Sequence, residues 1–396
     1  FIGSMTSSEA SGMESVLGYN ASTNSYDELY STDLIVSIGH VDENHPIMAV
    51  KMKYAAREKA KLVSISSSKT RMEDYANISF NPYNNIEFLK SFIKALFDGG
   101  YVNEGEVSNK AENLDGLKNY VKDAKDCTDA ANLAKMYGEA KKAIIVIDDD
   151  IVTEDTYKLL ADAAVITGKI GKPHSGIIIV RSSSNAQGFI DIGIKAKGME
   201  ILEQIKEGKI KAAVIIGEDP VGDDKDTAEI LKNLEFLATL DTFMTDTALI
   251  SNVVVPIGSF AESEGTLTRS DRKVQKITPA ISAANVNTLF NNLSKIAQHL
   301  DINIVTLSQA VEMLSSEIEA YSGLCEADIQ NEDIYVPNSR TNTYGSQVLC
   351  TDGFNKEFKK AVLALPEGDK MFKDKKVYDS IQMRFDSYLK EKGLTR

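Results

Sequence analysis

The chain has 396 residues, of which 43% are hydrophobic and 26% charged, a composition typical of a soluble globular protein with two or three domains. Its net charge of −14 is offset by no basic stripe, so binding to nucleic acid is not expected. The apolar runs are too short to cross a bilayer, and we expect no transmembrane segment and no signal peptide. Because it starts at Phe1 in a strand-like run, the sequence is expected to begin inside a longer native chain.

The strand-like runs of the first part of the chain alternate with helical patterns. Asp33–Ile38 and Lys61–Ile65 are apolar runs of strand length, and a helix is expected between them from about His45 to Ala60. This βαβ order predicts parallel strands joined by a right-handed crossover. An amphipathic helix follows over Asn85–Phe97, and the glycines and mixed charges of Tyr101–Asp126 indicate a connecting segment at a domain junction.

A second α/β set follows this junction. Its expected strands are Ala143–Ile147, Gly176–Val180, Ala212–Gly217, Phe236–Leu240 and Asn252–Val255, and its expected helices are about Thr153–Thr167, Met199–Glu207 and Asp226–Leu234. From Asn285 the pattern is helical to about Ser316, and a last amphipathic helix is expected over Lys376–Lys392. The predicted fold class is therefore α/β, with two Rossmann-like parallel-sheet domains over 1–126 and 127–284 and a mostly helical C-terminal extension over 285–396.

Metal-binding patterns are sparse. The three cysteines, Cys127, Cys325 and Cys350, form no C-x-x-C pair, and the four histidines are dispersed. Iron–sulfur clusters and structural zinc need three or four clustered ligands, so no metal site is predicted. His45 and His174 are interpreted as a helix-start and a loop residue, and no catalytic residue is assigned. The scarcity of cysteine favours a cytoplasmic location, which leaves open attachment to a membrane-bound complex.

Polar turns follow the predicted strands, where ligands of parallel sheets bind. They are Ile38–Pro46, Ser64–Arg71, Ile147–Asp155, Val180–Phe189, Ile216–Pro220, Leu240–Ala248 and Ser251–Gln275. No G-x-G-x-x-G, Walker A or G-x-S-x-G string is present, so nicotinamide, ATP and hydrolase chemistry of the standard kinds have no direct support. We expect the seven turns to face one cleft.

The turns resemble those of the molybdopterin oxidoreductase family in order and spacing. The strings are "IGHVDENHP", "SNAQGFIDIG", "AAVIIGEDP" and "DTFMTDTALISNVVVPIGSFAESEGTLTRSDRKVQ", and the resemblance covers most of Asp33–Ala280. The family includes formate dehydrogenases and the large iron–sulfur subunit of respiratory complex I, and its turns wrap a molybdopterin guanine dinucleotide. The resemblance implies that the cofactor-contacting residues are Gly39, Glu43, His45, Ser66, Arg181, Asn185, Gln187, Gly188, Gly217, Glu218, Pro220, Asp241, Thr245, Glu262, Gly265 and Thr266.

Three departures from the family pattern bear on this cleft. Asp148–Asp150 replaces a small-residue turn, and a carboxylate about 5 Å from a phosphate costs roughly 3 kcal/mol; alternatively, the three aspartates only cap the next helix in solvent. The turn Ser66–Arg71 lacks the acidic residue that recognises a guanine edge. Ala10 runs directly into Ser11, where relatives carry a long segment with the thiolate or selenolate metal ligand and a catalytic histidine.

Three functions remain open. The first is a scaffold without its own cofactor, like the C-terminal part of the complex I large subunit, not itself catalytic, with iron–sulfur clusters upstream or in partner subunits. Its partners would include a flavin-bearing, NADH-oxidising subunit and an iron–sulfur subunit. The second is a catalytic metal-pterin oxidoreductase, such as a formate dehydrogenase, whose active-site segment is missing from this sequence. The third is a small-molecule binding module. Apolar residues in Val377–Leu389 either pack on the chain itself or dock a neighbouring subunit.

Overall fold

The largest sheet of the protein has five parallel strands. The computed structural model describes residues 11–82, 85–150, 152–194, 198–282, 286–331, 334–337 and 347–366. Across this sheet the strand order is β3-β2-β1-β5-β6. The strands are β1 (Leu34–Ile38), β2 (Lys61–Ile65), β3 (Ile78–Phe80), β5 (Ala143–Asp148) and β6 (Gly176–Val180). The predicted α/β fold class is confirmed.

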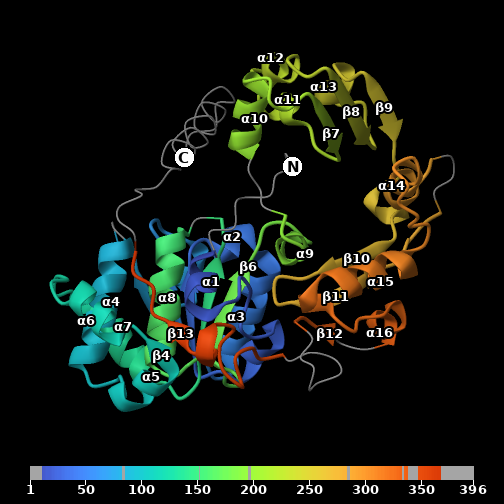
Figure 1. The fold of residues 1–396 in the computed structure, drawn as a ribbon. Coiled ribbons are helices and arrows are strands. Elements are labelled where there is room, and N and C mark those ends of the chain that lie inside the picture. Colours follow the sequence, from blue (N-terminus) through green and yellow to red (C-terminus); the bar gives the residue numbers. More distant parts are fainter. Residues whose placement is uncertain are drawn as a thin grey trace.

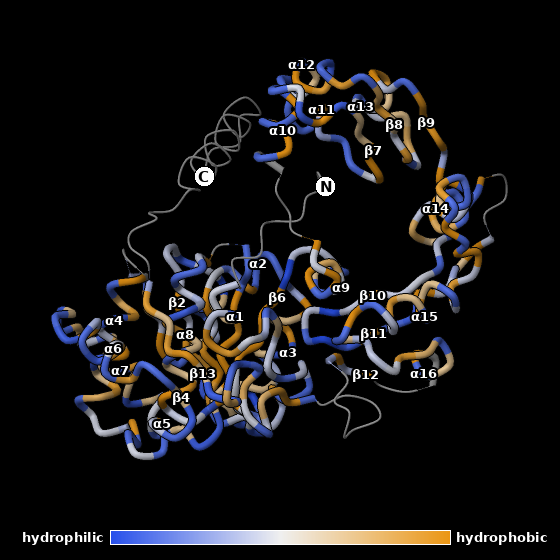
Figure 2. Tube along the Cα trace, in the orientation of Figure 1, coloured by the Kyte–Doolittle hydropathy of each residue, from blue (hydrophilic) through white to orange (hydrophobic). Residues whose placement is uncertain are grey.

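Both faces of this sheet are covered by helices. Strand residues alternate between two cores: Leu34 and Val36 contact one set of apolar side chains, and Ile35 contacts the other. This fits a parallel sheet, whose strands are apolar on both faces, and in Figure 2 orange, hydrophobic stretches of the tube gather in the middle of this unit. The helices around the sheet are α1 (Ser11–Leu17), α2 (Val41–Asn44), α3 (Pro46–Glu58), α4 (Asn85–Asp98), α5 (Glu104–Lys110), α6 (Leu114–Val121), α7 (Thr128–Glu139), α8 (Glu154–Ile166) and α9 (Ala186–Asp191).

The sheet reverses its direction of growth between β1 and β5. The chain adds β2 and β3 on one side of β1, and then returns to add β5 and β6 on the other. Ile38 at the end of β1 lies beside Ile147 in β5, so the turns that leave these two strands start next to each other. Such a switch point is where open parallel sheets bind ligands. The topology therefore locates the candidate site.

The strand grouping predicted from the sequence was wrong at this point. It assigned Ala143–Ile147 and Gly176–Val180 to the second α/β set, but both pair into the first sheet, β5 directly with β1. The segment Tyr101–Asp126, expected to be a connection at a domain junction, contains α5, α6 and β4 (Ala111–Glu112) and packs into the same unit. The long insertion between β3 and β5 is helical cover for one sheet.

A second, smaller parallel sheet has the order β7-β8-β9. Its strands are β7 (Ala212–Ile216), β8 (Phe236–Asp241) and β9 (Val253–Pro256), and its helices are α10 (Gly198–Lys206), α11 (Pro220–Asp223), α12 (Thr227–Leu231) and α13 (Asp246–Leu249). The bounds of the three strands and of α10 match the expected ones within one residue. Helix α12 ends three residues before the expected Leu234, and α11 and α13 were not predicted. In Figure 1 this sheet stands apart from the first one.

The remaining described residues join the two units. The strands are β10 (Gly265–Thr268), β11 (Lys273–Ile277) and β12 (Ile334–Tyr335), which form an antiparallel sheet, and β13 (Ala361–Val362), which pairs with β4. The helices are α14 (Leu289–Gln298), α15 (Leu307–Glu317) and α16 (Glu326–Asn331). The C-terminal region thus adds strands to two sheets besides its predicted helices. The predicted helix Lys376–Lys392 lies outside the described residues.

Within the described part of the chain, none of the helices combines the length and the hydrophobicity that a membrane crossing requires.

Asp162 lies inside α8 with no exposed surface. One carboxyl oxygen accepts from the Ala364 N–H, and the other has no hydrogen-bond partner. Burial raises the pKa of Asp162 well above its usual value, against smaller lowering effects of that N–H and of Lys158. The folded protein therefore retains a proton on Asp162 at pH values at which the unfolded chain has lost it.

Because of this difference, protein stability is expected to fall as the pH rises above the usual carboxyl pKa. The loss is about 1.4 kcal/mol per pH unit until the raised pKa is reached. Asp162→Asn removes this slope, so its advantage over the native protein should grow with pH. Urea denaturation of both proteins between pH 5 and 8 measures the effect. Parallel pH profiles would show that Asp162 does not titrate abnormally.

Candidate functional site

The turns that follow β1 and β5 are tied together by Asp148. One carboxyl oxygen accepts from the His40 backbone N–H at 3.2 Å and from the Asn44 amide at 2.8 Å. The other lies 3.2 Å from the His45 Nε2 atom. Asp148 is fully buried and His45 is 9% exposed. The last residue of β5 thus fixes the loop between β1 and α3.

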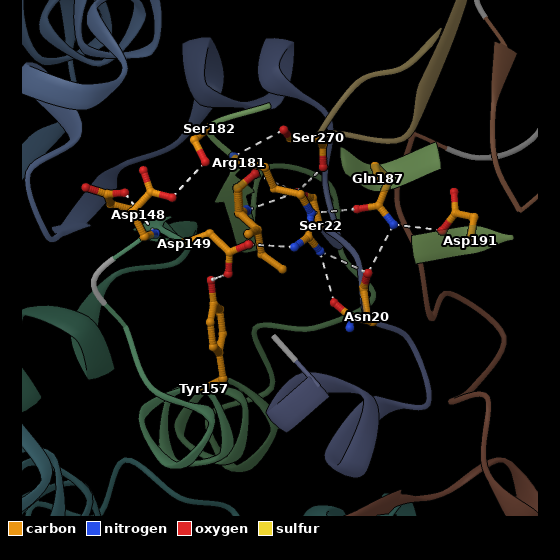
Figure 3. A network of polar contacts seen from close by, with 12 residues as sticks. Asn20, Ser22, Asp148, Asp149, Tyr157, Arg181, Ser182, Gln187, Asp191 and Ser270 are labelled. Atoms are coloured by element: carbon orange, nitrogen blue, oxygen red, sulfur yellow. Dashed lines mark hydrogen bonds and ion pairs between the residues drawn. The ribbon is translucent and has the colours of Figure 1, made fainter. Parts of the chain in front are cut away.

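Asp149, the next residue, forms a buried ion pair with Arg181. The distance from Nη1 to the carboxylate is 2.7 Å, and the two side chains are 2% and 4% exposed. The sheet register explains the pair, because Asp148 lies opposite Val180 and the following residues of both strands are then neighbours. The Tyr157 hydroxyl donates to Asp149 at 2.7 Å (Figure 3). Burial, and next the charge of Asp149, raise the pKa of Tyr157 well above its usual value, so the hydroxyl remains a donor.

Arg181 is held from several sides. Its Nε donates to the side-chain amide oxygen of Gln187 at 3.2 Å, and its Nη2 donates to the Asn20 side chain at 2.9 Å and to the Asn20 backbone carbonyl. Gln187 donates in turn to Asn20 and to Asp191 (Figure 3). The network joins the segment after α1 to the turns after β5 and β6.

The structure changes the electrostatic picture drawn from the sequence. Asp149 is paired with Arg181, and Asp148 is hydrogen-bonded on both oxygens, so the acidic turn does not present three free charges to the crevice. The alternative that the aspartates cap the next helix in solvent was also wrong. Thr153 caps α8 instead, by accepting from the Thr156 N–H.

The pKa values of the two outer aspartates move in opposite directions. Burial acts to raise the pKa of Asp148, but the hydrogen bond and charge of His45, with the donors of Asn44 and Asp150, lower it overall. For Asp150 burial is the largest cause, and the charges of Asp148 and Asp149 add to it, so the pKa is raised despite a hydrogen bond from Ser182. Of these two carboxylates, Asp150 is thus the less stabilised in its charged form.

A cleft of about 450 Å³ opens beside this network. Its polar wall contains three successive serines, Ser182–Ser184, and the basic side chains of Arg181, Arg269 and Lys51. The first turn of α3, from Pro46 to Met48, forms another wall, and the residue before this helix, His45, does not cap it with its side chain. Hydroxyl groups, cations and an uncapped helix start together suit a phosphate-bearing ligand. The rest of the lining is Tyr26, His45, Val180, Leu267, Ser270 and Gln275.

The other predicted residues of the first unit lie near the same sheet edge. Gly39 follows β1 with a φ of 96°, a conformation that a glycine adopts without strain. Ser66 follows β2 and is buried, while Glu43 is exposed in α2, with its carboxylate 3.7 Å from the His40 ring. Asn185 accepts from the Thr268 N–H and so connects the start of α9, which contains Gln187 and Gly188, to β10. None of these six residues is among those that line the cleft, whereas the predicted residues His45 and Arg181 are.

The remaining predicted residues belong to other parts of the fold. Gly217, Glu218 and Pro220 follow β7, and Asp241 and Thr245 follow β8, so all five occupy the carboxyl edge of the second sheet. Glu262, Gly265 and Thr266 lie at or just before β10, and Glu262 accepts from the N–H and hydroxyl of Ser259. None of these eight residues lines the cleft. Of the seven turns expected to face one cleft, three line this one: Ile38–Pro46, Val180–Phe189 and Ser251–Gln275.

Sequence reasoning missed Asp148, Asp149, Tyr157 and Asn20 as members of the site. A signal was present for two of them. An acidic turn directly after a buried strand, and a basic residue directly after the next strand, become neighbours if the two strands pair in register. Asn20 and Tyr157 carried no such signal, because their contacts with Arg181 and Asp149 depend on the packing of α1 and α8.

The three cysteines of the chain lie away from the cleft. Cys127 precedes α7, Cys325 is exposed beside α16, and Cys350 is half-buried. None of them is among the lining residues. The described residues therefore offer hydroxyl, imidazole, carboxylate and guanidinium groups at the site, but no thiolate.

Comparisons with known proteins agree on one family. The model of a family described as molybdopterin oxidoreductase matches residues 3–286. The F420-dependent formate dehydrogenase subunit alpha of Methanocaldococcus jannaschii is 28% identical over 88% of this chain and 60% of its own length. Formate dehydrogenase H of Escherichia coli is 26% identical over 73% of this chain and 48% of its own length. The chain thus spans about 60% or less of these curated relatives.

A solved structure shares the fold. Acetylene hydratase from Pelobacter acetylenicus superposes with a TM-score of 0.68, covering 90% of this chain and 58% of that protein. The sequence identity is 11%, so this likeness concerns the fold alone.

Proposed function

We propose that this chain, which belongs to the molybdopterin oxidoreductase family, forms part of the alpha subunit of a multi-subunit oxidoreductase. The oxidoreductase would be of the formate dehydrogenase type. The observation that carries this proposal is the cleft at the switch point of the first sheet, lined by serines, basic residues and an uncapped helix start. The names of the relatives support the substrate class: three are alpha subunits of F420-dependent formate dehydrogenases, 25–28% identical to this chain.

The residues of the cleft fit a phosphate-bearing pterin cofactor. Ser182–Ser184 and the first turn of α3 would donate hydrogen bonds to phosphate oxygens, and Lys51 and Arg269 would add positive charge. Asp149 holds the guanidinium of Arg181 in one orientation at the edge of the cleft. The apolar side chains of Met48 and Leu267 would exclude water from one wall. When bound, a metal-pterin group supplies the electron-transfer chemistry of such enzymes.

Partner subunits form part of the proposal. Relatives named as alpha subunits imply at least one further subunit, which would carry electrons to or from the site. A flavin- or NADH-dependent partner and an iron–sulfur partner are our specific proposals, together with a cytoplasmic location.

Metal and pterin analysis of the purified native complex tests this function. We expect about one molybdenum or tungsten atom and an oxidisable, fluorescent pterin per chain, and formate-dependent reduction of an artificial acceptor. A complex that contains this chain in stoichiometric amount but neither metal nor pterin would overturn the catalytic proposal.

The second candidate is a scaffold without its own cofactor, and one observation favours it. The polar groups of Arg181 and Gln187, both expected to contact a cofactor, are bound within the chain to Asp149, Asn20 and Asp191. A chain whose polar site residues are already paired gains less from a ligand that must displace those partners. The metal-free, pterin-free outcome of the same analysis would establish this function.

A further inference from the structure

His45, Asp148 and Asp150 form a compact group of metal-binding side chains. One ligand atom of each residue lies within 4.8 Å of the other two. His45 comes from the turn after β1, and the aspartates come from the end of β5 and the turn behind it. The group therefore sits at the switch point of the sheet, where the turns that leave β1 and β5 meet.

The distance between His45 and Asp148 matches that between two ligands of one cation. The His45 Nε2 atom and an Asp148 carboxyl oxygen are 3.2 Å apart. Two ligands bonded at about 2.1 Å, with an angle of about 90–110° between them, lie about 3.0–3.4 Å apart. Asp150 supplies the third ligand atom within 4.8 Å of the other two, and its carboxylate accepts a hydrogen bond from the Ser182 hydroxyl.

The charge of the group also favours a cation. Three carboxylates follow one another at this turn, and the ion pair with Arg181 accounts for Asp149 alone. Asp148 is fully buried and Asp150 half-buried, so the group places two carboxylates beside the His45 imidazole in a largely buried position. Buried charges in proteins are usually paired or bound to a metal. A divalent cation would balance both charges and use the imidazole nitrogen as a third ligand.

We propose that His45, Asp148 and Asp150 bind a divalent cation of the Zn²⁺ type, with at least one open coordination position toward the cleft. One imidazole and two carboxylates are ligands that Zn²⁺ accepts, and three protein ligands leave a position for water or an anionic oxygen. His45 lines the cleft, as does Ser182, which donates to Asp150, so that position is reachable by a ligand. Mg²⁺ is expected to bind much more weakly, because it prefers an octahedral shell of oxygens.

Zinc binding to the purified full chain tests this site. The chain should carry Cys325→Ser, which removes the exposed thiol as a competing ligand. Metals are first removed with a chelator, and the chain is then dialysed against Zn²⁺. We expect mass spectrometry to find one zinc atom per chain. Calorimetry measures the Zn²⁺ affinity of the chain and of each variant. His45→Gln and Asp150→Asn should each weaken binding more than tenfold.

Two matched variants serve as controls. His174→Gln changes a histidine that contacts Glu28, and Asp155→Asn changes an acidic residue that pairs with Lys158; neither belongs to the group. Both should retain full zinc binding. If His45→Gln fails to fold, the visible spectrum of the Co²⁺-loaded parent chain reports the ligands directly and should lack a sulfur charge-transfer band. Less than half a zinc atom per chain, equal losses in the control variants, or a sulfur band would overturn the proposal.

Discussion

Asp149→Ala is expected to lower the free energy of unfolding by about 3–5 kcal/mol, the cost of leaving one charge of a buried ion pair without its partner. Arg181 is 2% exposed at its side chain, so water cannot replace the lost carboxylate without rearrangement of the network. The Tyr157 hydroxyl loses its buried acceptor in the same variant. Urea denaturation followed by circular dichroism measures the loss.

Two further variants separate the burial of charge from the loss of any ion pair. Glu235→Ala breaks the pair with Lys211, whose side chains are 68% and 69% exposed, and should cost less than about 1 kcal/mol. Asp149→Ala combined with Arg181→Met removes both charges and should recover part of the stability. If Asp149→Ala were no more harmful than Glu235→Ala, the ion pair would not hold the turns together.

The strands of this protein could be predicted from the local sequence pattern, but the pairing of the strands into sheets could not. Lys61–Ile65 and Gly176–Val180 were predicted with the observed bounds, because each is a short apolar run between turn residues. Nothing within Ala143–Ile147 indicates whether it pairs with β1 or with a strand of the second sheet, since both neighbours are equally apolar. The pairing depends on how the helices between β3 and β5 pack.

The candidate site was predicted in part, for a related reason. Resemblance pointed to His45, Arg181 and Gln187, and the structure gathers all three around one sheet edge. The acidic turn was interpreted as a source of repulsion because the sequence alone does not pair Asp149 with Arg181. Once the register of β5 and β6 is known, this pair follows from adjacency. Residues that act through tertiary packing, such as Tyr157, require the fold itself.

Arg272 should be the next most sensitive position. Its side chain is 1% exposed, and it donates from Nε to the Ser22 carbonyl, from Nη1 to the Val336 carbonyl and from Nη2 to the Gln347 carbonyl. Burial lowers its pKa to about 10, so the group stays charged at neutral pH. One guanidinium thus ties the turn between β10 and β11 to three distant segments.

Arg272→Met is expected to cost at least about 3 kcal/mol, because it leaves buried carbonyls without donors. Arg272→Lys should fall between Met and the native residue, since a single ammonium cannot reach three carbonyls in the geometry of a guanidinium. Arg57→Met, an exposed change on α3, is the control and should remain within about 0.5 kcal/mol of the native protein. Denaturation midpoints give the order of the three variants, and limited proteolysis should cleave Arg272→Met faster near Gln347. A Lys variant as stable as the native protein would mean that charge, and not the fork of three hydrogen bonds, is what position 272 contributes.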